Sequence, residues 1–372
     1  MLNKRILLSA NTSWNIYNYR LGIIKALKEK GCTVHVAAPI DEFASLLEDI
    51  GCQFHNIAVD NKGVNPLRDI QTFLQYYRLY RCLKPDLVLH YTVKPNIYGS
   101  LAARLLGIPV INSITGLGAV FICESWVTRL VEVLYRVSQS RAQAVFFQNN
   151  DDKQLFLDRG LVKPQTVRCV SGSGVDITKF RPLPLPDLNT SFKFLFTGRM
   201  LWDKGIGELV SAAQKLKIKY PRVEVQLLGY LDVENPKAIS RKILNGWVED
   251  GLVNYLGSTN NVADFIAKAH CIILPSYREG LSHSLLEAAA MARPIIVTNT
   301  PGCREVVDDG KNGYLCRHRD SCDLASKMEK LLLLSEEERA VMGKKGREKV
   351  LHEFDENIVI SHYLQEIYKI LR

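Results

Sequence analysis

The stretch CIILPSYREGLSHSLLEAAAMARPIIVTN, residues 271–299, decides the fold. It begins with an apolar run at 271–276 and ends with a second one at 294–299, and neither run alternates with polar residues. Residues 284–292, between the two runs, are good helix formers. Two fully apolar strands on either side of a helix predict a parallel βαβ unit whose sheet is covered on both faces.

The same alternation recurs along the chain. In the second half we expect further strands at 193–198, 223–229 and 253–257, and each is followed by a segment of helical period. In the first half the expected strands are 5–10, 33–39, 86–90, 110–114, 144–148 and 166–170. The sequence therefore predicts an α/β protein of two doubly wound, Rossmann-like domains, and two cores suit a length of 372 residues.

The boundary between the domains is predicted from prolines. The segment RPLPLPDLNT (181–190) has three prolines in five positions and cannot continue a helix or a central strand. We expect an N-terminal domain at 1–180, a linker at 181–191 and a C-terminal domain at 192–352. Residues 353–372 contain a last amphipathic stretch, which we expect to pack back on the first domain. Two such domains would face each other across an inter-domain cleft.

Composition excludes several classes of protein. Hydrophobic residues make up 47% and charged residues 23%, which excludes a disordered or fibrous chain. No apolar stretch approaches the roughly 18–20 residues that a membrane-spanning helix needs. The nine cysteines are scattered and show no metal-binding or redox spacing, so we expect a reduced, cytoplasmic setting and no metal site.

Residues 275–287 predict an anion site in the second half. Glu279 and Gly280 follow a strand, and Glu287 lies about one turn into the next helix. Backbone N–H groups of Leu281, Ser282 and His283 would point from the start of that helix towards a ligand, which fits a diphosphate better than a single carboxylate. Glu279 alone could also be an ordinary acid at a helix start.

Residues 197–210, TGRMLWDKGIGELV, predict the cationic part of the same site. Gly198 ends a strand, and Arg199 and Lys204 lie in the loop that follows it. Two cations at the mouth of the sheet could neutralise a diphosphate as it leaves. Taken singly, each of these motifs occurs often by chance.

Taken together, the motifs resemble those of the retaining glycosyltransferases of family 4, over essentially the whole chain. These enzymes have the GT-B fold of two facing Rossmann-like domains. The features that carry the resemblance are Gly198–Arg199 with Lys204–Gly205, the E-x₇-E pair Glu279 and Glu287, the Gly174–Val175–Asp176 turn with Phe180, and the closing helix.

The resemblance implies roles for these residues. Arg199 and Lys204 would bind the diphosphate of a UDP-sugar, Glu279 the hydroxyls of its sugar, and Glu287 its ribose. Residues 257–259, which include Thr259, would hold the base together with Val262. It also implies transfer without a protein nucleophile, with the leaving phosphate taking the acceptor's proton. We expect no cofactor and no metal, because no Asp-x-Asp motif is placed to carry one.

The first domain departs from the common family pattern. Residues 11–15, NTSWN, replace a glycine-rich loop, and Ile114 or Thr115 stands where many members have histidine. Segments 15–27 and 91–121 instead resemble bacterial enzymes that extend undecaprenyl-diphosphate-linked sugars, N-acetylgalactosaminyltransferases of glycan assembly among them. We expect Tyr17, Arg20, Lys94, Thr115 and Gly116 to bind the acceptor, although Tyr17 and Arg20 could equally flank the first helix.

The net charge of +9 is unevenly divided. Up to residue 180 there are 21 Lys and Arg against 14 Asp and Glu, and after it 27 against 25. Residues 65–85 and 126–141 predict helices with basic and apolar side chains, which suit an anionic membrane surface. Either could instead be an ordinary helix with a solvated basic face. No nucleic-acid-binding motif accompanies the charge.

We therefore expect a hexosyltransferase peripheral to the inner face of the cell membrane. It would move an N-acetylhexosamine, with N-acetylgalactosamine the first choice, from UDP to a polyprenyl-diphosphate-linked saccharide. Two alternatives remain: a UDP-sugar epimerase of the same fold, and a two-domain sugar-binding protein without enzymatic activity. A short apolar start, expected to be a strand rather than a signal peptide, disfavours the second.

Overall fold

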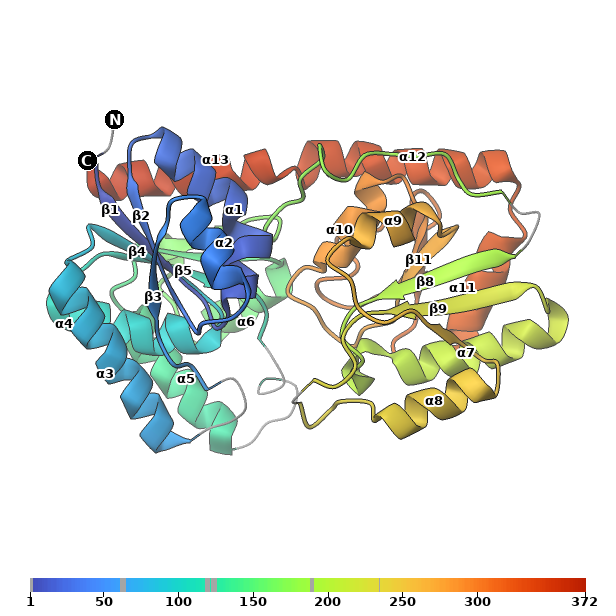
Figure 1. Cartoon of the computed structure of the whole chain (residues 1–372), viewed down its shortest axis with the longest axis horizontal. Coiled ribbons are helices and arrows are strands. Elements are labelled where there is room, and N and C mark those ends of the chain that lie inside the picture. Colours follow the sequence, from blue (N-terminus) through green and yellow to red (C-terminus); the bar gives the residue numbers. More distant parts are fainter. Residues whose placement is uncertain (1–2, 61–64, 118–120, 122–125, 188–190, 234) are drawn as a thin grey trace. The chain divides into compact units, whose positions relative to one another are not determined.

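The computed structural model describes residues 3–60, 65–117, 121, 126–187, 191–233 and 235–372. The chain forms two compact units (Figure 1). Unit 1 contains residues 1–173 and 356–372, and unit 2 contains residues 174–355. Both are parallel sheets with helices on both faces, so the predicted doubly wound α/β class is confirmed.

Unit 1 has a seven-stranded sheet of order β3-β2-β1-β4-β5-β6-β7 in which every pairing is parallel. Its strands are β1 Arg5–Ser9, β2 Thr33–Ala38, β3 Gln53–Asn56, β4 Leu87–Tyr91, β5 Val110–Ile114, β6 Ala144–Phe147 and β7 Val167–Cys169. Its helices are α1 Ser13–Glu29, α2 Phe43–Asp49, α3 Pro66–Leu83, the π-helix η1 Pro95–Gly99, α4 Ser100–Leu106, α5 Trp126–Gln139, α6 Asn150–Asp158, the 3₁₀ turn η3 Pro164–Thr166 and α13 Glu356–Leu371.

Unit 2 has a six-stranded parallel sheet of order β10-β9-β8-β11-β12-β13. Its strands are β8 Phe192–Thr197, β9 Val223–Leu228, β10 Asn254–Tyr255, β11 Cys271–Leu274, β12 Ile295–Thr298 and β13 Gly313–Cys316. Its helices are the 3₁₀ turn η4 Trp202–Lys204, α7 Ile206–Lys219, α8 Arg241–Glu249, α9 Val262–Ala267, α10 His283–Ala290, α11 Ser321–Leu332 and α12 Glu336–Glu353.

The last helix, α13, completes the core of unit 1. Val359, Tyr363 and Ile367 lie four residues apart on one face and are buried with the side chains of β1, β2 and α1. Tyr363 stacks on Phe146 with ring centroids 4.3 Å apart, and its hydroxyl hydrogen-bonds the Ser113 hydroxyl at 2.6 Å. Spacing of 3.6 residues per turn puts such residues on one stripe, which explains why this segment reads as amphipathic.

The two units divide earlier than the prolines suggested. The first division falls between residues 173 and 174, whereas the sequence prediction placed it after 180. Residues 174–187 belong to unit 2. Arg347 on α12 holds them there, since it donates hydrogen bonds to the Ile177 and Phe180 carbonyls at 3.2 and 2.9 Å. Of the predicted linker 181–191, residues 188–190 lie outside the described residues.

Arg293 ties this segment to the core of unit 2. Its side chain is fully buried and donates to the Leu183 carbonyl at 2.7 Å and the Pro184 carbonyl at 3.0 Å. It also donates to carbonyls at the end of α9, those of Ile266 and Ala267, at 3.1 and 2.8 Å. Burial lowers the pKa of Arg293 to about 10, so it remains charged at neutral pH.

Among the described residues, no helix has both the length and the apolar character that crossing a bilayer requires.

We predict that Arg293→Met lowers the free energy of unfolding of unit 2 by about 3 kcal/mol, because several buried carbonyls lose their hydrogen-bond donor. Urea unfolding followed by circular dichroism measures the change. The matched control is Arg317→Met, which removes an arginine whose side chain is 74% exposed and should change the midpoint little. Equal midpoints for the two variants would contradict the role assigned to Arg293.

Candidate functional site

The residues predicted to bind the donor lie at one edge of the unit 2 sheet. Because all its strands are parallel, their carboxyl ends meet at that edge, where open sheets of this kind bind ligands. Arg199 follows β8, Thr259 follows β10 and Glu279 follows β11. In the strand order β8 is the neighbour of β11 and the next neighbour of β10, so loops far apart in sequence end at the same edge.

Lys204 and Glu279 form an ion pair between the loops that follow β8 and β11. Both side chains are mostly buried, with exposed fractions of 19% and 14%. Gly205 allows the approach: its φ is +72°, and a Cβ there would collide with the Pro275 carbonyl. The structure thus brings together one of the two predicted cations and one of the two predicted acids.

Glycines also join the loops after β8, β9 and β10. The Gly229 N–H donates to the Gly257 carbonyl at 2.7 Å, and a Cβ on Gly229 would collide with the Gly198 carbonyl. The loop predicted to hold a nucleotide base therefore touches the end of β9, which in turn touches the loop that carries Arg199.

The other predicted donor-binding residues of these loops differ in exposure. Arg199 is exposed. Thr259 is half-buried, and its hydroxyl accepts a hydrogen bond from the Asn261 N–H at 3.0 Å. Val262 begins α9 and packs partly against the core. Arg199 therefore supplies an exposed positive charge on the loop after β8 that also carries Lys204.

The start of α10 is braced by the loop after β12. The Glu279 N–H donates to the Pro301 carbonyl at 2.9 Å, and the Ser282 N–H donates to the Gly302 carbonyl at 3.0 Å. Gly302 has φ +80°, and a Cβ there would lie 2.6 Å from the Glu279 Cβ. Ser282 is the N-cap of α10, but its side chain accepts no capping hydrogen bond from a backbone N–H of the helix; its hydroxyl instead hydrogen-bonds the Ser284 hydroxyl at 3.1 Å.

Glu287 pairs with His283 one turn earlier on α10. The distance from His283 Nδ1 to Glu287 Oε1 is 2.9 Å, and the two side chains are 18% and 14% exposed. The sequence analysis predicted only a backbone role for His283. The i, i+4 spacing of His283 and Glu287 on one helix could have predicted the contact between their side chains. Gly280 is buried and Leu281 half-buried at the start of this helix.

The structure adds Tyr277 and Arg319, which the sequence analysis missed. The Tyr277 hydroxyl donates to Glu208 at 2.7 Å, and the Arg319 guanidinium lies 4.5 Å from the Tyr277 ring centroid. Burial, followed by the hydrogen bond to Glu208, raises the pKa of Tyr277 to about 12. Arg319 follows β13, a strand that was not predicted, so nothing in the sequence placed this cation at the edge of the sheet.

Among the described residues at the carboxyl edge of the unit 2 sheet we find neither a set of metal ligands nor a reactive thiol. Among the described residues, no group of three or more His, Cys, Asp or Glu side chains could hold a metal ion. The Cys303 thiol lies close to Glu279, and burial together with that carboxylate raises its pKa. Cys303 is therefore a neutral thiol at pH 7.

The residues predicted to bind the acceptor lie in unit 1, and most already have partners. Lys94 pairs with Asp69 at 2.6 Å. Tyr17 packs on Phe43 with ring centroids 5.4 Å apart. Arg20 is buried and lies over the ring of Tyr91.

Thr115 and Gly116 are half-buried directly after β5, and Gly116 has φ +131°. Residues 118–120 of the same predicted loop lie outside the described residues.

We predict that Gly302→Ala displaces the loop at Glu279 and weakens UDP binding at least tenfold, because the new Cβ would overlap the Glu279 backbone. Gly310→Ala is the matched control: Gly310 has φ +75°, but no atom lies within 4 Å of its added Cβ. Both variants place alanine at a similar positive φ, so a difference between their UDP affinities, measured by titration calorimetry, reports the effect of the collision with Glu279. Equal UDP affinities would contradict the bracing role of Gly302.

Two family models match the chain. The model described as Glycosyl transferase 4-like matches residues 5–149, and the model described as Glycosyl transferases group 1 matches residues 184–349. Together they cover most of both units.

Two related glycosyltransferases and one solved structure also match the chain over most of its length. The chain is 30% identical over 374 residues to the N,N'-diacetylbacillosaminyl-diphospho-undecaprenol alpha-1,3-N-acetylgalactosaminyltransferase of Campylobacter jejuni, with 96% of each chain covered. It is 25% identical over 312 residues to the Escherichia coli UDP-Gal:alpha-D-GlcNAc-diphosphoundecaprenol alpha-1,3-galactosyltransferase, covering 79% of this chain and 78% of that one. A solved structure of Anabaena Alr3699/HepE in complex with UDP and glucose superposes with a TM-score of 0.79 at 17% identity, covering 98% of this chain and 99% of that one.

The expected family is thus confirmed by the family models and by a relative that aligns along nearly the entire chain. The expectation of an enzyme is confirmed with it, and the alternative of a sugar-binding protein without activity is not supported. The chain belongs to the group 1, family 4-like glycosyltransferases and has their GT-B fold.

Proposed function

We propose that this glycosyltransferase moves a sugar from UDP to a polyprenyl-diphosphate-linked saccharide, with retention of the anomeric configuration. The observation that carries the proposal is the Lys204–Glu279 pair at the carboxyl edge of the unit 2 sheet, with the exposed Arg199 on the same loop as Lys204. The two relatives named above act on diphospho-undecaprenol-linked sugars, which supports this class of acceptor.

The donor diphosphate is assigned to Lys204, Arg199 and the start of α10. Glu279 neutralises Lys204, so a bound diphosphate would compete with that carboxylate for the ammonium group. Glu279 would then be released to accept hydrogen bonds from the sugar hydroxyls. The pair therefore couples diphosphate binding to sugar binding.

The nucleoside is assigned to Glu287 and to the loop at Thr259. A carboxylate accepts hydrogen bonds from both ribose hydroxyls, and His283 keeps Glu287 oriented through the 2.9 Å contact. Because the loop after β10 is joined to β9 and through it to β8, the base and the diphosphate would be held on one connected surface.

Transfer is proposed to need no metal and no protein nucleophile. As the sugar separates from UDP, positive charge develops on the sugar and negative charge on the leaving phosphate. Arg199 and Lys204 supply the stabilising cations on the phosphate side. The leaving phosphate oxygen takes the proton of the attacking hydroxyl on the same face of the sugar, which retains the configuration.

We predict that Lys204→Ala and Glu287→Ala each weaken UDP binding at least tenfold, because each removes a charged hydrogen-bonding partner. Titration calorimetry measures the affinity. The controls are Lys215→Ala and Glu249→Ala, which remove the same charges from α7 and α8 away from the carboxyl edge. Unchanged UDP affinity in both test variants would refute the donor-site assignment.

The reaction itself is tested with UDP-sugars and lipid-linked acceptors. UDP-N-acetylgalactosamine is the first donor to test, and UDP-galactose the second, after the names of the two relatives. We expect a product with retained configuration by NMR and the same rate in EDTA. An inverted product would contradict the mechanism, loss of activity in EDTA would contradict metal independence, and conversion of a UDP-sugar without acceptor would indicate an epimerase.

Membrane association is proposed through the outer faces of α3 and α5. The helix α3 buries Asp69, Thr72, Tyr76 and Tyr80, so Leu67, Ile70 and Leu74 on its other face are exposed. On α5 the exposed apolar residues Trp126, Leu130, Val133 and Val137 repeat at helical spacing. Both helices lie in unit 1 and pack against η1.

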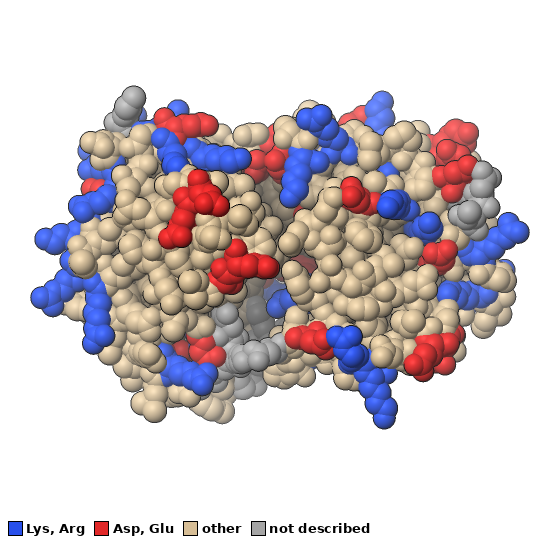
Figure 2. Space-filling view, viewed as in Figure 1, with Lys and Arg blue, Asp and Glu red and all other residues tan. Residues whose placement is uncertain are grey.

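Basic residues accompany both apolar faces. Arg78, Arg81 and Lys84 are exposed at the end of α3, and Arg129 and Arg136 are exposed on α5. Figure 2 shows Lys and Arg side chains along the edge of unit 1 over α3 and α4. Exposed apolar rows flanked by arginines suit insertion between anionic lipid headgroups. The sequence of unit 1 contains 22 Lys and Arg against 15 Asp and Glu.

We predict that the double variant Trp126→Ser/Leu130→Ser binds phosphatidylglycerol vesicles at least tenfold more weakly, because it removes apolar area from the inserted face. Vesicle flotation measures binding, and raising the salt from 0.1 to about 0.5 M should weaken the wild type by screening. Leu333→Ser, at a position 67% exposed in unit 2, is the control. Equal binding by all three proteins would exclude this face.

A further inference from the structure

Arg20 is a buried cation without an anionic partner in the described part of the chain. It lies on α1 with a relative exposure of 4%, and its Nε hydrogen finds no acceptor there. The contact that the structure gives its guanidinium is the face of the Tyr91 ring, at 4.1 Å from the centroid.

An arrangement of this kind is unfavourable for the chain alone. A buried charge is costly unless ion pairs and hydrogen bonds compensate it, and the face of a ring does not accept hydrogen bonds from the edge of the guanidinium. A cation–π contact offsets only part of that cost. The guanidinium of such an arginine can still donate hydrogen bonds to an anionic ligand.

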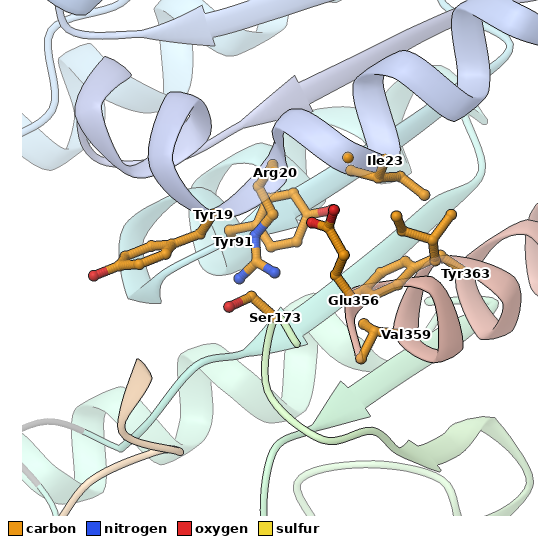
Figure 3. A pocket seen from close by; sticks show the side chains of 10 residues that line it. Tyr19, Arg20, Ile23, Tyr91, Ser173, Glu356, Val359 and Tyr363 are labelled. Atoms are coloured by element: carbon orange, nitrogen blue, oxygen red, sulfur yellow. The ribbon is translucent and has the colours of Figure 1, made fainter. Parts of the chain in front are cut away.

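Arg20 also lines a small cavity, together with Tyr19, Tyr91, Ser173, Glu356 and Tyr363 (Figure 3). In the close-up the end of the guanidinium points towards Ser173. The cavity holds about 10 Å³, which is room for one water molecule or one ligand oxygen. Glu356 also lines the cavity from α13, and a Cβ on Gly22 would lie 2.8 Å from its Oε2 atom.

The cavity lies where unit 1 would receive a ligand. Tyr91 is the last residue of β4, and Ser173 follows β7, so both lie at the carboxyl edge of the unit 1 sheet. Parallel sheets bind ligands at this edge. All the residues that line the cavity belong to unit 1.

The other predicted acceptor residues do not offer an uncompensated charge. Lys94 pairs with Asp69 at 2.6 Å, and the second oxygen of Asp69 accepts a hydrogen bond from Tyr98 at 2.8 Å. Tyr17 packs on Phe43. Among the residues predicted to bind the acceptor, Arg20 combines a positive charge with a buried donor that lacks an acceptor in the described residues.

We propose that Arg20 binds a phosphoryl oxygen of the acceptor's diphosphate, with that oxygen entering the cavity and the rest of the group at its mouth. This inference rests on the proposed function, which supplies a diphosphate-linked acceptor. A guanidinium matches phosphate oxygens with two parallel N–H donors, and in a buried site such bonds are short and strong. The Tyr91 ring packs against the guanidinium, which reduces the freedom lost when the anion binds.

The first test separates affinity for the acceptor from affinity for the donor. The acceptor is undecaprenyl-diphosphate-linked N-acetylglucosamine in detergent. Arg20→Met should raise its KM about tenfold to hundredfold and leave the KM of the UDP-sugar unchanged. Arg20→Lys should lie in between, because it keeps the charge but loses the fork. Lys25→Met, which removes an exposed charge from the same helix, should match the wild type.

A structural role for Arg20 predicts a different outcome. Because Arg20→Met replaces an uncompensated buried charge by an apolar side chain of similar length, the proposal expects an unchanged or higher Tm together with the raised KM. A lowered Tm with an unchanged acceptor KM would show that Arg20 serves only the fold and would overturn the proposal.

The second test does not depend on the acceptor. In the Lys204→Ala background, which weakens the donor site, inorganic pyrophosphate should still raise the Tm, and adding Arg20→Met should abolish that rise. If pyrophosphate protects through Arg20 but no lipid-linked diphosphate is used, the anion site stands and the proposed acceptor fails. If pyrophosphate protects both proteins alike, or neither, the site at Arg20 is refuted.

Discussion

The parallel direction of every strand is the constraint on which the rest of this protein depends. In a parallel sheet each strand must be followed by a crossover that returns over one face, and the carboxyl ends of all strands collect at one edge. Residues as far apart in sequence as Lys204 and Glu279 therefore meet there. Glycines at 205, 229 and 302 then set how closely the loops approach, since each lies where a Cβ would overlap a neighbouring backbone.

The sequence predicted the architecture well where burial on both faces left a continuous apolar run. β1, β8 and β11 are of this kind, and all were expected within a residue or two of their bounds. It missed β3, an edge strand whose residues QFHN are mostly polar, and β13, a short strand that begins with Gly313. An edge strand pairs with only one other strand and is less covered than a central one. Its residues can therefore be more polar, and its sequence is harder to distinguish from that of a loop.

For the candidate site, the sequence predicted which loops form the site. It did not predict which contacts their side chains make. Spacing placed Glu279 and Lys204 near the carboxyl edge, but whether they pair depends on the backbone around Gly205. The ring stack of Tyr277 with Arg319 joins the loops after β11 and β13, and such long-range contacts leave no periodic signal. Likewise, arginine at position 20 reads as a helix-flanking residue until its burial over Tyr91 is known.

The place of α13 has a consequence for how the chain folds. Unit 2 is continuous in sequence, from 174 to 355, whereas unit 1 is built from two segments on either side of it. During synthesis unit 2 can close its core as soon as its residues emerge, but unit 1 lacks Val359, Tyr363 and Ile367 until the last helix appears. The first 173 residues therefore wait with part of an apolar sheet face uncovered, and their exposure to chaperones and to aggregation lasts as long as the ribosome takes to make unit 2.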